Sequence, residues 1–72
     1  MGKKRERIST GFGERLRAIR EKKGLTLAAV GEAAGLHFQA IARLERGEVE
    51  PTWPTVLKLA EALKVPVGKF HS

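Results

Sequence analysis

Short segments with helical periodicity, each followed by a glycine, are the feature that most constrains how this chain folds. In the first segment, the residues that would share one face of a helix are three or four positions apart: Phe12, Leu16, Ile19 and Lys23. This spacing predicts an amphipathic helix that starts at about Phe12. Gly24 predicts its end, because glycine adopts the left-handed conformation that closes many helices.

A second helix is predicted over Leu27–Ala34. Thr26 is suited to cap it, because a threonine hydroxyl can accept a hydrogen bond from a free N–H group of the first turn. Val30 and Ala33 are expected to face the core. Gly35 then predicts the end of this helix.

A third helix is predicted over about residues 38–46. Ile41 and Leu44 form its buried stripe, and Gly47 ends it. Phe38 allows two interpretations: it packs inward, or it presents an apolar edge to the methyl groups of thymines. Packing in the core is the favoured one, because most large apolar side chains are buried.

A fourth helix is predicted to begin after Thr52, which can cap it. Trp53 falls in the first turn and is expected to anchor the core or to cover the third and fourth helices. The apolar face of the helix is predicted to consist of Val56, Leu57, Ala60 and Leu63. Residues 67–70 predict a last short turn that closes the core. No alternating segment and no hairpin dipeptide is found, so the predicted fold class is all-α.

Basic residues are concentrated at the start of the chain. Residues 1–11 contain Lys3, Lys4, Arg5 and Arg7 and almost nothing apolar. We therefore predict a flexible basic arm over residues 1–11 and a single domain over residues 12–72. The net charge of the 72-residue chain is +6, which favours polyanionic partners such as nucleic acids.

The residue types present argue against an enzyme or a metal protein. The chain has no cysteine, only two histidines, and no aspartate from which a Ser-His-Asp set could be built. No apolar run approaches the roughly 20 residues that cross a bilayer. We therefore expect no catalytic residue, no metal, no cofactor and no membrane span. A cytoplasmic location, in association with the nucleoid, is the corresponding expectation.

Residues 25–47 carry the most informative pattern. Their two predicted helices are joined only by Gly35, Leu36 and His37. A glycine allows such a sharp turn, and Leu36 can fill the gap between the two helices. This geometry projects the second helix of the pair outward. The major groove of DNA, about 12 Å wide, can receive such a helix.

Several stretches, taken in order and at their spacing, carry a resemblance to a known family. They are residues 16–26, 35–36, 41–47, 51–52, 57–63 and 65–67. Together they resemble the lambda-repressor-like helix-turn-helix domains of the Cro/cI or Xre type, over about residues 12–70. The resemblance implies a compact bundle of four or five helices in which residues 38–46 form the recognition helix. It also implies that Arg20 pairs with Glu45 and holds the recognition helix from behind.

The resemblance further implies base contacts from the start of the recognition helix and from one turn later. The matching residues are Phe38, Gln39, Ala42 and Arg43. Gln39 can bond adenine through two hydrogen bonds, and Ala42 can touch only a thymine methyl. Arg43 can reach either guanine or a phosphate, and these alternatives stay open. For Gln39, the alternative is a solvated surface residue.

Contacts to phosphates are expected around this helix. The N–H groups of the second helix, next to Thr26, can bind a phosphate, although Leu27 stands where family members often carry a polar side chain. His37 is expected as a cap or a phosphate neighbour. Arg46 partly compensates for two acidic residues in a loop that is often basic in the family, Glu48 and Glu50. The arm residues Lys3, Lys4 and Arg5 can wrap the duplex or can only add long-range attraction.

Two functions follow from these patterns. The first is a transcriptional regulator, a repressor or an activator, that binds double-stranded DNA of specific sequence, with a homodimer as an expected assembly. An antitoxin or a restriction controller would use the same chemistry. The alternative is a coactivator-like module on the same fold that binds another protein through an apolar patch. A positive stripe along the recognition helix favours the first function. An apolar patch interrupted by Glu48 and Glu50 favours the second.

Overall fold

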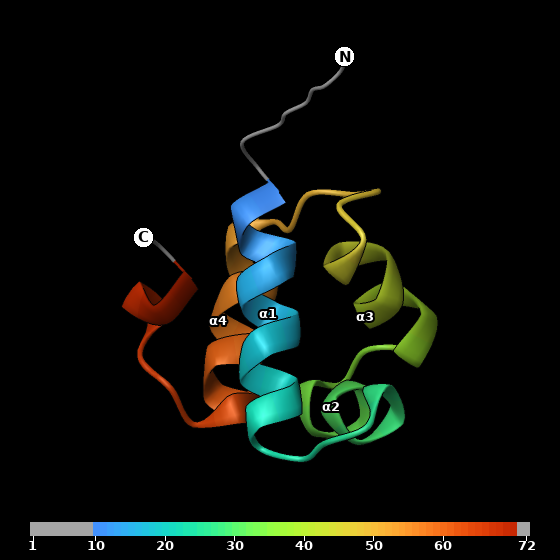
Figure 1. Cartoon of the computed structure of the whole chain (residues 1–72), viewed down its shortest axis with the longest axis vertical. Coiled ribbons are helices and arrows are strands. Elements are labelled where there is room, and N and C mark those ends of the chain that lie inside the picture. The colour runs from blue at the N-terminus through green and yellow to red at the C-terminus, as the bar shows by residue number, and fades with distance from the viewer. Residues whose placement is uncertain (1–9, 71–72) are drawn as a thin grey trace.

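The computed structural model describes residues 10–70, which form four α-helices and one short 3-10 helix without any strand. The helices are α1 (Thr10–Lys22), α2 (Leu27–Ala34), α3 (Phe38–Glu45) and α4 (Trp53–Leu63), followed by η1 (Val67–Phe70). The predicted all-α class and the predicted short turn at residues 67–70 are therefore confirmed. In Figure 1, α3 and η1 lie on opposite sides of α1, and α2 lies near the end of α1.

The ends of the helices follow from local chemistry. The Thr26 hydroxyl accepts a hydrogen bond from the N–H group of Ala29 at 3.0 Å, which caps α2 as predicted. Gly35 closes the same helix in the left-handed conformation, with φ of 73°. Thr52 caps α4 by accepting a hydrogen bond from the N–H group of Thr55 at 3.3 Å.

Two helix boundaries differ from the prediction. α1 begins at Thr10, two residues before Phe12, so the last two residues of the predicted arm belong to the helix. The apolar pattern could not reveal this, because Thr10 and Gly11 add nothing to the apolar face. α3 ends at Glu45, and Arg46 serves as its C-terminal cap.

One core joins all the helices. Its largest fully buried side chains are Leu16, Val30, Ile41, Leu59 and Leu63. α2 packs against α3 and α4, whereas α1 packs against α3 and η1. The ring of Phe12 lies 4.9 Å from that of Phe70, centroid to centroid, and so joins the start of α1 to η1.

The structure corrects several expectations about which side chains fill this core. In α2, Ala34 is buried and Ala33 is exposed. Positions three and four residues after Val30 both lie near its face of the helix, and the one that faces the core here is Ala34. In α4, the inward stripe passes through Leu59, which leaves Leu57 43% exposed.

Trp53 is also exposed, at 59% of its surface, and neither anchors nor covers the core. It is the first residue of α4, and the first residue of this helix that packs against the core is Val56, one turn later. The tryptophan therefore lies at the end of the element, beyond the apolar interior.

Candidate nucleic-acid interface

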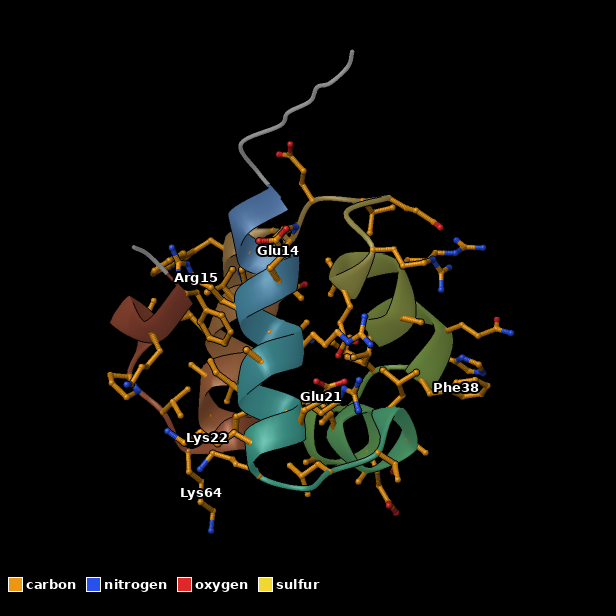
Figure 2. The ribbon with its side chains drawn as sticks, viewed as in Figure 1. Glu14, Arg15, Glu21, Lys22, Phe38 and Lys64 are labelled. Carbon is orange, nitrogen blue, oxygen red and sulfur yellow. The ribbon has the colours of Figure 1, made fainter. Side chains whose placement is uncertain are left out.

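The two faces of α3 differ sharply. Ile41 and Leu44 are buried in the core, whereas Gln39 and Arg43 are exposed on the outer face. Phe38 is 46% exposed and points away from α1 in Figure 2. The favoured prediction that Phe38 packs in the core is therefore wrong. As the first residue of α3, it stands before the buried stripe begins.

The turn that carries α3 is tightly packed. The N–H group of Leu36 donates to the carbonyl oxygen of Gly31 at 2.7 Å, which closes the end of α2. A side chain at Gly31 would place its Cβ only 2.5 Å from the carbonyl oxygen of Leu36. Glycine at this position thus lets α2 approach the turn closely. The relative orientation of α2 and α3 is fixed by backbone contacts.

His37 caps the start of α3. Its Nδ1 atom accepts a hydrogen bond from the N–H group of Gln39 at 3.1 Å. The imidazole also stacks on the ring of Phe38, with centroids 4.7 Å apart and an angle of 27° between the planes. The hydrogen bond of the cap fixes the imidazole, and the stacking fixes the phenyl ring against it, so the orientation of the half-exposed Phe38 ring is set by His37.

The guanidinium of Arg20 holds the far end of α3. Its Nε and Nη2 atoms donate to the two carboxylate oxygens of Glu45, at 2.6 and 3.1 Å. Its Nη1 atom donates to the carbonyl oxygen of Leu25 at 2.9 Å. The arrangement is the two-point contact expected between these residue types.

This pair is largely shielded from solvent. The side chains of Arg20 and Glu45 are 13% and 8% exposed. The hydrogen bonds that Arg20 donates to the Glu45 carboxylate raise the pKa of Arg20 above its ordinary value, and partial desolvation opposes that shift. The acceptor at Leu25 is a backbone carbonyl and thus left no signal in the sequence.

Arg46 and Glu48 form an exposed ion pair beside α3, through Nε and Oε2. The hydrogen bond from Arg46 lowers the pKa of Glu48 below its ordinary value. The pair is therefore formed at neutral pH. No pattern in the sequence indicated this pairing. It engages Arg46, which was expected to contact phosphate.

The structure brings four of the proposed contact residues together at the start of α3 and one turn later: Phe38, Gln39, Ala42 and Arg43. Ala42 is half-buried and the other three are exposed. Thr26 is exposed at the start of α2, where its hydroxyl is occupied by the cap. The arm residues Lys3, Lys4 and Arg5 lie outside the described residues.

Residues 10–70 show neither a metal-ligand cluster nor a membrane span. Within residues 10–70, no group of three or more histidine or acidic side chains is placed to hold a metal ion. The helices of the same segment are all too short or too polar to cross a bilayer.

Comparison with known proteins defines the family. A model of helix-turn-helix domains matches residues 12–69, and the chain belongs to this family. The HTH-type transcriptional repressor RghR of Bacillus subtilis is 45% identical over 56 residues, which cover 76% of this chain and 42% of RghR. The lambda-repressor-like resemblance is thereby confirmed.

Solved structures agree with this assignment. The restriction-modification controller protein C.AhdI from Aeromonas hydrophila superimposes with a TM-score of 0.83 at 32% identity, over 86% of this chain and 94% of that one. The c2 repressor of Salmonella phage P22, crystallised with a synthetic operator, superimposes with a TM-score of 0.76 at 37% identity. That match covers 82% of this chain and 89% of the repressor chain. Against the curated relatives, this chain spans between 24% and 42% of their length.

Proposed function

We propose that this chain is the DNA-binding head of a transcriptional regulator, and that α3 enters the major groove. The observation that carries the proposal is the outer face of α3. It presents an exposed amide at Gln39 and an exposed guanidinium at Arg43, one turn apart, on a helix fixed from behind by Arg20. A relative with the same fold was crystallised with an operator.

Each residue of this face has a chemical counterpart in the groove. Gln39 can bond the N6 and N7 atoms of adenine, and Arg43 can bond guanine or a phosphate. Phe38 has no hydrogen-bonding group, so the thymine methyl is the feature of the groove that suits its exposed ring. Ala42 is expected to make a smaller contact of the same kind.

Phosphate contacts would set the register on the duplex. The candidate groups are the N–H groups at the start of α2, beside Thr26, and the exposed imidazole of His37, directly before α3. Arg46 can join them only by leaving Glu48. The arm residues Lys3, Lys4 and Arg5 would add attraction that weakens with salt.

A homodimer is the assembly that suits this function. One head makes a small interface, and two heads would contact half-sites about 34 Å apart, one turn of the duplex. We expect the protein to act as a repressor without catalytic activity, in the cytoplasm and on the nucleoid.

A protein-binding module on the same fold is the second candidate. The exposed ring of Phe38 and the exposed acidic loop residues Glu48 and Glu50 favour it, because carboxylates repel phosphates and apolar rings attract proteins.

Selection from a pool of random duplexes at one fixed salt concentration separates the two candidates. A palindromic consensus, lost in the Gln39→Ala, Arg43→Ala double variant, is the expected result. Lys58→Ala is the control, because it removes the same charge from an exposed position on α4. Enrichment of no sequence would favour the protein-binding module.

A further inference from the structure

A groove lies on the side of the domain away from α3. The last two turns of α1 contribute Ala18, Ile19 and Lys22, and Lys23 follows directly after the helix. The segment after α4 contributes Val65 and, within η1, Lys69. The volume of the groove is about 280 Å³. Ile19 and Val65 are half-buried and pack against the core, so the floor is apolar and firmly supported.

The rim of this groove is positively charged. Lys22, Lys23 and Lys69 line it, and none of them forms an ion pair with a carboxylate of residues 10–70. Lys22 and Lys23 also suit the negative end of the α1 dipole, which is a purely structural reason for their presence. Lys69 lies in the four-residue η1, where this reason is much weaker.

A fourth lysine, Lys64, neighbours the groove in the sequence and has an unfavourable backbone conformation. It immediately precedes Val65 and adopts the left-handed conformation, with φ of 59°. Among residues 10–70 it is the only residue other than glycine that does so. Glycine avoids the cost of about 1–2 kcal/mol that this conformation imposes on other residues. A lysine at this position therefore sacrifices some stability and adds a charge.

The groove is separate from the proposed DNA interface. Figure 2 shows Lys22 and Lys64 on one side of the molecule and Phe38 on the other. A duplex seated on α3 would thus leave the groove open to a second partner.

We propose that this groove, defined by the six lining residues given above, binds an acidic amphipathic segment of a partner protein. Apolar side chains of the segment would contact Ala18, Ile19 and Val65, and its carboxylates would meet the lysines of the rim. Grooves of this kind receive amphipathic helices through anchors three and four residues apart. Opposite charges around an apolar contact supply the specificity.

Two other occupants fit less well. Two copies of this chain related by a two-fold axis through the groove would bring their lysine rims together, and like charges repel. The groove is also open to solvent, whereas small-molecule sites usually enclose most of their ligand. A few side chains of a peptide make better use of such a space.

Selection from a displayed library of peptides about 15 residues long, four helical turns, tests the proposal on the full chain. We expect enriched peptides to combine several carboxylates with apolar residues at helical spacing. Fluorescence anisotropy then gives the dissociation constants of these peptides for designed variants. The proposal does not depend on DNA binding, so its failure and that of the proposed function are distinguishable.

Two pairs of variants separate a seated peptide from general attraction. Lys69→Glu is compared with Lys58→Glu, an equal change of charge outside the groove. Ala18→Arg adds a positive charge but fills the floor, and its control is Ala33→Arg, at an exposed alanine of α2. We expect Lys69→Glu and Ala18→Arg each to weaken binding about tenfold or more, whereas the controls change it little. Circular dichroism and thermal melting check the folding of all four.

Three outcomes would overturn the proposal. Peptides that bind Ala18→Arg as tightly as the wild type, or more tightly, would be held by charge alone. A selection that enriches nothing beyond a parallel selection on Ala18→Arg would show that the groove has no peptide ligand. A mixed-sequence duplex whose affinity falls more with Lys69→Glu than with Lys58→Glu would assign these lysines to nucleic acid.

Discussion

The guanidinium of Arg20 links α1 to two other segments. It donates to Glu45 at the end of α3, to the carbonyl of Leu25 before α2, and it is itself part of α1. Removing one member of a shielded ion pair leaves the other without compensation for its lost hydration. Arg20 and Glu45 are therefore the residues at which a single substitution should be most costly to the position of α3.

Glu45→Ala should lower the free energy of unfolding by about 3 kcal/mol, because it leaves the Arg20 guanidinium shielded and unpaired. For a domain of this size the melting temperature should fall by roughly 12 °C or more. Thermal melting measures the effect, with Glu61→Ala at an exposed position of α4 as the control. Replacing both partners, as in Arg20→Met with Glu45→Leu, should recover part of the loss. A melting temperature unchanged by Glu45→Ala would remove the proposed role of the pair.

Phe38→Ala should weaken operator binding with little change in the melting temperature, because nearly half of this residue is exposed and it is not part of the buried core. Replacing the contacted thymine by uracil removes one methyl group, which is worth about 0.8 kcal/mol, or roughly fourfold in affinity. That replacement should affect the wild type and leave Phe38→Ala unaffected. Titrations of both proteins on both duplexes form a double-mutant cycle. Equal effects of uracil on the two proteins would contradict the methyl contact.

The elements of this fold meet at backbones as well as at side chains. α1 crosses the end of α3 at Gly13, where a Cβ atom would collide with the carbonyl oxygen of Leu44 and lie 2.8 Å from that of Glu45. Gly11, two residues earlier in the same helix, has no atom within 4 Å of such a Cβ. The two glycines therefore form a matched pair on one helix.

Gly13→Ala should destabilise the domain by about 1–3 kcal/mol, because the backbone of α3 must move to make room. Gly11→Ala should instead stabilise it by up to about 1 kcal/mol, since alanine favours a helix more than glycine does. Chemical denaturation measures both changes, and the opposite signs are the decisive result. A stabilising Gly13→Ala would mean that α1 and α3 are less closely packed.

The sequence was sufficient for the helix ends wherever the chemistry is local. Thr26, Gly35 and Thr52 act on their nearest neighbours, so their identity predicts what they do. The inward faces depend instead on how neighbouring helices cross. The choice between Ala33 and Ala34 therefore needed the structure, as did the exposure of Leu57.

In the candidate site, too, some features could be predicted from the sequence and others needed the structure. Family resemblance placed Gln39 and Arg43 on the outer face, and their exposure agrees with that placement. The sequence left two positions open for Phe38 and could not decide between them, because its burial depends on where the core ends and its orientation depends on stacking with His37. The pairing of Arg46 with Glu48 depends on the path of a loop and was equally hidden.

Electrostatics acts on the scale of the whole molecule. Deleting the first residues, with Lys3, Lys4 and Arg5, should make DNA binding less dependent on salt, because fewer counterions are released. The slope of log affinity against log salt should become less negative by about 0.9 for each phosphate that the arm no longer neutralises. Titrations with one duplex at several salt concentrations measure it. The same slope with and without these residues would exclude an arm contact.

Acid should loosen the exposed ion pairs. Hydrogen bonds from Arg17 and Arg46 lower the pKa values of Glu21 and Glu48 below the ordinary 4.5. A carboxylate with a lowered pKa stabilises the folded state above its ordinary pKa, and this contribution is lost as the pH falls through the lowered value. Glu21→Gln should therefore melt below the wild type at neutral pH, and the difference should close under acid conditions. Melting curves from about pH 7 to about pH 3 test this. A difference that persists at the lowest pH would assign it to packing.

The three hydrogen bonds that the Arg20 guanidinium donates also affect the thermodynamics of recognition. Because α3 has reached its final orientation before a ligand arrives, the backbone needs no ordering during association. Only the side chains of its outer face remain to be immobilised, at about 0.5–1.5 kcal/mol each. Pre-organisation of this kind leaves the free energy of the contacts available for discriminating one ligand from another.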